Sequence, residues 1–127
     1  MRADTNAPDV FDVYTVVLLR RAPNAPEMTD AELGALQERH LAYRAGLRRD
    51  GIIVAYGPLG EQSDVRMRGL SIWTCDIGEA KRLSDGDPMV QAGRLTYDVM
   101  EWWVAAGSLA FPGARQPVGE RRMMPED

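Results

Sequence analysis

The chain has 127 residues and a mass of 14.1 kDa, which is the length of one ordinary domain. An apolar share of 45% and a charged share of 27% are close to the globular average and exclude a chain that is disordered throughout. The net charge of −4 argues against nucleic acid as the main partner, because binding to phosphates requires a clustered basic surface.

The start of the chain is polar and lacks the apolar region of a secretory signal. No stretch approaches the roughly eighteen apolar residues of a membrane helix. We therefore expect a cytoplasmic protein with no membrane partner. Cys75 is the single cysteine, which excludes an internal disulfide, and we expect it to be a buried free thiol.

The first half of the chain predicts a strand and a long helix. Residues 1–11 are polar and predict a loose N-terminal arm, and residues 12–20, rich in β-branched and aromatic side chains, predict the first strand. Thr29 and Glu32 match a capping box, which predicts a helix over residues 30–50 that stops at Gly51.

The second half predicts three strands and a short helix. The strands are expected over residues 52–56, 70–75 and 95–104, with a polar connection over residues 60–67. Residues 76–83 have the apolar spacing of a short helix. Asp87, followed by proline, is typical of the N-cap of one extra turn. Residues 105–127 form a C-terminal extension with several prolines and glycines.

The predicted order is β-α-β-β-α-β, which is the ferredoxin-like pattern of an α+β fold. In that fold a four-stranded antiparallel sheet carries both helices on one face. The other face should be polar in a monomer, yet both faces of the first and last strands are largely apolar. We therefore expect the second face to pack against another copy of the chain as a two-fold dimer.

His40 is the only histidine, and it lies on a stripe of the first helix that faces the sheet. The stripe consists of Leu33, Leu36, His40, Tyr43 and Leu47. From the stripe alone, His40 is either a core histidine bonded to a backbone carbonyl or a catalytic base beside a cavity. The second interpretation needs an acidic partner that fixes the imidazole tautomer.

Asp87 is the best candidate for that partner. It lies in the turn before the last strand, which the fold can place over the same sheet face as the first helix. A carboxylate there could bond one imidazole nitrogen and leave the other as a base. The alternative is an N-cap alone, and the two roles are compatible.

Several short motifs follow one another in a specific order and spacing over residues 12–104. They are the opening strand over 14–20, His40-Leu41, Asp50-Gly51-Ile52-Ile53, Tyr56-Gly57-Pro58-Leu59, Arg68-Gly69-Leu70-Ser71, Glu79-Ala80, Asp87-Pro88-Met89, and Gly93 before a last strand with tryptophan. Taken together, these motifs resemble the YCII-related family of dimeric α+β barrel proteins.

This resemblance implies a ferredoxin-like protomer and a dimer whose sheets meet face to face. It also implies a pocket in which His40 and Asp87 have the active-site role. Five further residues are weaker candidates for binding a substrate, and a purely structural role is the favoured interpretation of each: Tyr14, Tyr56, Arg68, Ser71 and Trp73. We expect no metal site, because there is no second histidine, and no cofactor, because no glycine-rich phosphate loop follows a strand.

These observations favour a small cofactor-free enzyme that uses a His-Asp pair for proton transfer, with isomerase or lyase chemistry. Its substrate would be a small organic metabolite, and analogy with barrel relatives suggests a cyclic or aromatic one. Two alternatives stay open at this point. One is a binding or regulatory dimer that holds a metabolite without turnover, and the other is a structural dimerisation module without a ligand.

Overall fold

The computed structural model describes residues 10–111, and the expectations for residues 1–9 and 112–127 lie outside this range. The observed order is β-α-β-β-α-β, with one extra helical turn before the last strand. The elements are β1 (Phe11–Arg21), α1 (Asp30–Arg49), β2 (Ile53–Pro58), β3 (Met67–Trp73), α2 (Ile77–Asp85), α3 (Pro88–Gln91) and β4 (Leu95–Ala105). The predicted α+β, ferredoxin-like protomer is confirmed.

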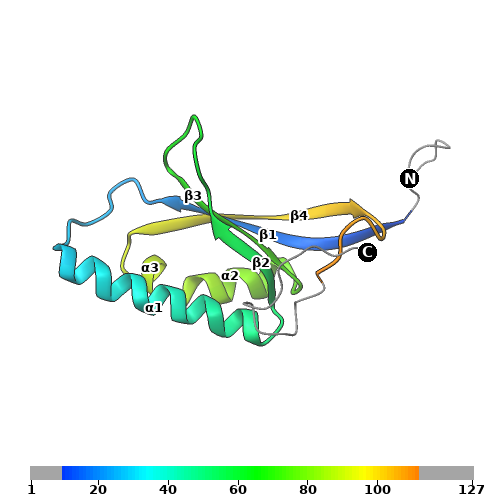
Figure 1. The fold of residues 1–127 in the computed structure, drawn as a ribbon, viewed down its shortest axis with the longest axis horizontal. Coiled ribbons are helices and arrows are strands. Elements are labelled where there is room, and N and C mark those ends of the chain that lie inside the picture. The colour runs from blue at the N-terminus through cyan, green and yellow to red at the C-terminus, as the bar shows by residue number, and fades with distance from the viewer. Residues whose placement is uncertain (1–9, 112–127) are drawn as a thin grey trace.

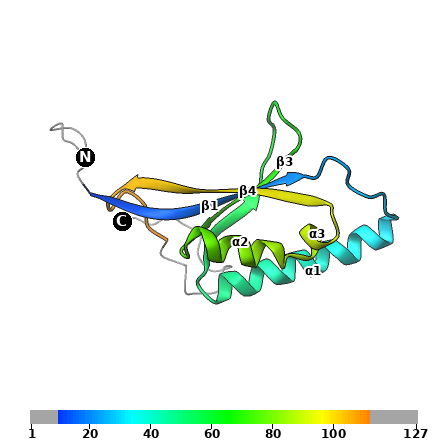
Figure 2. The same cartoon turned by 180° about the vertical axis from the view of Figure 1, so that it is seen from behind.

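The four strands form one antiparallel sheet in the order β2-β3-β1-β4. All three helices lie on the same face of this sheet (Figures 1 and 2). Strands β1 and β4 are the longest, and they pair along their whole length from Phe11 opposite Ala105 to Arg21 opposite Leu95. No helix among residues 10–111 is long and apolar enough to cross a membrane.

Helix α1 begins and ends where the sequence predicts. The Thr29 hydroxyl accepts a hydrogen bond from the Glu32 amide at 3.1 Å, and the Glu32 carboxylate accepts one from the Thr29 amide at 2.9 Å. At the other end Gly51 has a φ of 78°, a left-handed conformation that glycine adopts without a steric penalty. Both ends are therefore fixed by local chemistry, which sets the position of every residue along the helix.

Strand β3 starts earlier than predicted. The sequence predicted a polar connection up to residue 67 and a strand over residues 70–75, whereas β3 runs from Met67 to Trp73. Gly69 pairs with Leu19 on one side and with Pro58 on the other. This stretch has a low strand propensity, so its residue types do not predict a strand. It forms one because pairing with neighbouring strands satisfies its backbone hydrogen-bonding groups. The early start of β3 therefore lies beside the end of β1, where Met67 pairs with Arg20.

The core lies between the sheet and the helices. The predicted alternation of β1 is confirmed, because Val17 and Leu19 point toward the helices into the buried cluster. Trp73 is the largest side chain with no exposed surface. The buried cluster consists of Val17, Leu19, Leu47, Ile53, Trp73 and Ala80.

The opposite face of the sheet carries an exposed apolar surface. Leu70, Met100 and Trp102 retain 40%, 40% and 42% of their accessible area. They alternate along their strands with side chains that point toward the helices. The apolar character that the sequence predicts for both faces is therefore present.

Candidate functional site

Helix α1 places two polar side chains between itself and the sheet. His40 and Arg44 are four residues apart, so they lie on the same face of the helix. His40 is 9% exposed and Arg44 is 3% exposed. Buried polar groups need partners, and a buried guanidinium needs a counter-charge.

Asp87, in the turn between α2 and α3, is both the partner of His40 and the counter-charge of Arg44. It is the N-cap of α3, and its Oδ1 accepts a hydrogen bond from the Met89 amide at 2.9 Å. The same oxygen lies 2.7 Å from Nδ1 of His40. Its Oδ2 lies 3.4 Å from Nη1 of Arg44. The carboxylate has no exposed surface, so one buried group caps a turn, contacts the imidazole and pairs with the arginine.

The buried network continues from Arg44 into the sheet. Nη2 of Arg44 donates to Oγ of Ser71 at 2.8 Å, and the Trp73 indole N–H donates to the same oxygen at 2.7 Å. Ser71 in turn donates to the carbonyl of Val17 at 3.2 Å. The Arg44 guanidinium lies 5.6 Å from the centre of the Trp73 ring. Burial lowers the pKa of Arg44, and the nearby charge of Asp87 opposes that shift.

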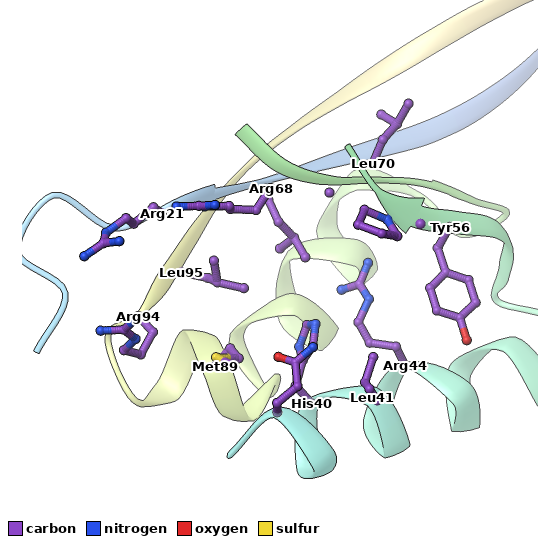
Figure 3. A pocket seen from close by; sticks show the side chains of 15 residues that line it. Arg21, His40, Leu41, Arg44, Tyr56, Arg68, Leu70, Met89, Arg94 and Leu95 are labelled. Atoms are coloured by element: carbon purple, nitrogen blue, oxygen red, sulfur yellow. The ribbon is translucent and has the colours of Figure 1, made fainter. Parts of the chain in front are cut away.

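A cavity of about 520 Å³ opens beside this network. Figure 3 shows His40 and Arg44 rising into it from α1, with Tyr56 on one side and Arg21, Arg68 and Arg94 on the other. The remaining lining is largely apolar and comprises Leu19, Gln37, Leu41, Gly57, Pro58, Gly69, Met89 and Leu95. Leu70 also borders the cavity, although its side chain points to the opposite face of the sheet (Figure 3). A volume of this size suits a small organic molecule.

The structure brings most of the predicted site residues together, in two positions. His40, Tyr56 and Arg68 line the cavity. Asp87, Ser71 and Trp73 lie behind it and support His40 and Arg44 through the hydrogen bonds described above.

Tyr14 is separate from this group. It does not line the cavity, because it points to the opposite face of β1. There its ring packs edge-on against Phe111, with the ring centres 5.5 Å apart.

The sequence analysis did not identify Arg44, Arg21 or Arg94 as site residues. For Arg44 a signal existed, since it follows His40 by four residues on the same helix face. The predicted stripe used Tyr43 instead, which is half-buried and donates to the carbonyl of Leu83 at 2.7 Å. A charged residue interrupts the apolar stripe of a core-facing helix and so does not suggest burial. Here, however, Arg44 is buried because it forms an ion pair with Asp87.

The contact with Asp87 determines which ring nitrogen of His40 is free. When the carboxylate is ionised it only accepts hydrogen bonds, so Nδ1 then donates to it and, in a neutral ring, the lone pair lies on Nε2. Within residues 10–111 no group forms a hydrogen bond with Nε2. The arrangement can therefore accept or return one proton at Nε2.

Other reactive groups lie elsewhere or are absent from the described part of the chain. In residues 10–111 no three His, Cys, Asp or Glu side chains come close enough to hold a metal ion. Cys75 is half-buried just after β3, and burial raises the pKa of its thiol.

Comparison with solved structures returned distant similarities. A 5-chloro-2-hydroxyhydroquinone dehydrochlorinase from Burkholderia phenoliruptrix, solved with 2,5-dihydroxybenzoquinone, has 19% identity and a TM-score of 0.44 over 69% of this chain and 92% of that chain. A cofactor-independent oxygenase from Streptomyces nogalater has 18% identity and a TM-score of 0.39 over 80% of this chain and 98% of that chain. A search of curated proteins found no match.

The sequence itself gives a direct assignment. The model of the YCII-related domain matches residues 13–103, which span the sheet, the helices and every residue of the buried network. The chain belongs to the YCII-related domain family.

Proposed function

We propose that this protein is a cofactor-free enzyme that transfers a proton through Nε2 of His40, on a small cyclic or aromatic organic metabolite. The observation that carries the proposal is the 2.7 Å contact between Nδ1 of His40 and Asp87 at the wall of the cavity. This contact orients the ring and occupies Nδ1 in a hydrogen bond, so Nε2 is the ring nitrogen that can exchange a proton with a bound molecule.

The proposed chemistry begins with removal of a proton from a carbon next to a carbonyl group. Nε2 takes the proton, and the buried carboxylate of Asp87 stabilises the imidazolium that forms. Arg44 lines the same cavity, so its guanidinium can stabilise the negative charge that develops on the substrate oxygen. Return of the proton to a different carbon gives an isomerisation, whereas loss of a leaving group gives an elimination.

The cavity also bears on the alternatives. A purely structural module has no need of a cavity of about 520 Å³ beside its single histidine. Its presence favours a protein that binds a ligand. Turnover is what distinguishes the enzyme from a binding or regulatory protein, and this requires a kinetic test.

The test is exchange of carbon-bound protons for deuterium, followed by ¹H NMR with cyclic ketones and keto acids in D₂O. The wild-type protein is expected to accelerate exchange for at least one class of substrate. His40→Asn is expected to lower the rate by about 10²–10⁴-fold, because general base catalysis contributes a factor of this size.

The control for this experiment is Arg39→Gln, which changes an exposed residue of the same helix and is expected to leave the rate unaltered. Exchange that is equally fast in His40→Asn would overturn the assignment of the base. A wild-type protein that accelerates exchange of no substrate in the panel would argue for binding without turnover.

The proposal also includes a homodimer formed through the sheet face opposite the helices. Leu70, Met100 and Trp102 are exposed there, and burying such an apolar face against a second copy would stabilise both. Trp102→Glu is expected to convert a dimer into a monomer in sedimentation at micromolar concentration. Trp103→Glu is the matched control, because this neighbour points to the other face and is 57% exposed. A wild-type monomer, or equal effects of the two substitutions, would contradict this part of the proposal.

A further inference from the structure

We propose that the cavity binds an organic carboxylate, and that the acid group is held by Arg21, Arg68 and Arg94, which we name the arginine rim. The inference names the substrate class of the site, and it rests on the proposed function for the reaction that follows binding. The substrate would be a cyclic or aromatic acid with its carboxylate at the rim and its ring toward His40.

The fold brings the three arginines of the rim to one end of the cavity. Arg21 is the last residue of β1, and its amide donates to the carbonyl of Arg66 at 2.8 Å, next to β3. On the other side the Ala22 amide donates to the carbonyl of Arg94 at 2.9 Å. Arg68 belongs to β3, the strand whose early start was not predicted. Figure 3 shows these three side chains on the same side of the cavity.

The arginine rim has no counter-charge in the part of the chain that the structure describes. Among residues 10–111, no aspartate or glutamate lines the cavity. Within residues 10–111, the side chains of Arg21 and Arg68 have no hydrogen bond and no ion pair, and Arg94 donates to the carbonyl of Pro26 at 2.6 Å. These cations lie in a chain whose acidic residues outnumber its basic ones by 19 to 15.

Neighbouring arginines outside the cavity provide a contrast. Arg20 lies 2.6 Å from a carboxylate oxygen of Asp98, and Arg66 lies 3.0 Å from one of Asp64. Each is adjacent in sequence, or nearly so, to a rim arginine. Within residues 10–111, these two neighbours outside the cavity are therefore paired with carboxylates, whereas Arg21, Arg68 and Arg94 have no ion pair.

The chemistry of guanidinium groups indicates the class of ligand. Three like charges around one hollow repel each other, and an anion placed among them removes that repulsion. The planar fork of arginine matches a carboxylate with two parallel hydrogen bonds. Arg44 lies beside His40 and is bonded to Asp87 and Ser71, so we assign it to the reacting end of the cavity and the acid group to the rim. The anion is therefore expected at the rim, and the reacting carbon near Nε2 of His40.

The experiment compares 2-naphthoate with the neutral 2-naphthamide in NMR titrations of the full chain at low salt. The two probes have nearly the same shape and differ in charge. We expect naphthoate to bind at least about tenfold more tightly, since a hydrogen bond to a charged group contributes roughly that factor. Arg68→Gln is expected to lower the affinity for naphthoate by about tenfold and to leave that for naphthamide unchanged. Arg66→Gln, the paired arginine outside the cavity, is expected to change neither.

Three results would overturn the inference: equal affinity for the acid and the amide, equal losses in the Arg68 and Arg66 variants, or tighter binding of naphthyl phosphate than of naphthoate.

The His40→Asn variant separates this inference from the proposed function, since it should keep the preference for the acid. Arg68-dependent binding of naphthoate without any deuterium exchange would refute only the proposed enzyme. Exchange on neutral ketones, with no preference for acids, would refute only the arginine rim.

Discussion

Replacing Asp87 by alanine is expected to lower the free energy of unfolding by about 3–5 kcal/mol, because it leaves a buried charge without its partner. Arg44 is 3% exposed, and its ion pair with Asp87 is the only one it makes within residues 10–111. The same substitution removes the hydrogen bond to His40 and the cap on the Met89 amide. Urea unfolding followed by tryptophan fluorescence measures the change.

Asp76→Ala is the matched control for that measurement. Asp76 caps α2 by accepting from the Glu79 amide at 2.9 Å, but it is exposed and contacts no buried charge. Loss of an N-cap alone costs about 1 kcal/mol. Similar losses in the two variants would show that Asp87 acts only as a cap, and that the buried network contributes little to stability.

Arg44→Met is expected to destabilise the protein by about 3–5 kcal/mol as well, in this case by leaving the carboxylate of Asp87 buried without its cation. Methionine keeps much of the apolar stem of the side chain but makes neither the guanidinium hydrogen bonds nor the contact of the guanidinium with the Trp73 ring. Ser71 then loses one of its two donors, and only the indole of Trp73 still bonds its oxygen.

A double-mutant cycle tests whether Arg44 and Asp87 act as a pair. Asp87→Asn removes the charge and keeps the shape of the cap. The Arg44→Met/Asp87→Asn double variant should lose less unfolding free energy than the two single variants lose together, by about 0.5–3 kcal/mol. Arg39→Met, on the exposed side of the same helix, should change the stability by less than about 0.5 kcal/mol. Strict additivity in the cycle would contradict a direct interaction between the two charges.

The helices and strands of this protein are specified mainly by short-range signals in its sequence. The capping box at Thr29 and Glu32 and the glycine at position 51 specify the ends of α1 through contacts within a few residues. The alternation in β1 specifies which side chains face the core, since a strand repeats every two residues. Such short-range signals are enough to predict the order of elements and, with it, the fold.

The start of β3 and the role of Arg44 were not predictable in the same way. Met67 and Gly69 are in a strand because β1 pairs with both and β2 pairs with Gly69 from the other side, a property of the neighbouring strands and not of the residues. Arg44 is buried because a carboxylate from a distant turn reaches it. Its spacing of four residues from His40 places it on the same helix face, but only the tertiary structure supplies the counter-charge that allows its burial.

The sequence by itself determined the order of the strands and helices, the sheet-facing position of His40 and the presence of Asp87 in a capping turn. The tertiary structure decided that these two residues, 47 positions apart, lie at hydrogen-bond distance. It also decided that Arg44 joins them, that Tyr14 lies on the opposite face, and that three arginines with no ion pair in the described part of the chain meet at one cavity. Helix and strand patterns arise from contacts within a few residues and can be read along the chain, whereas a charge finds its partner only when the sheet brings distant segments together.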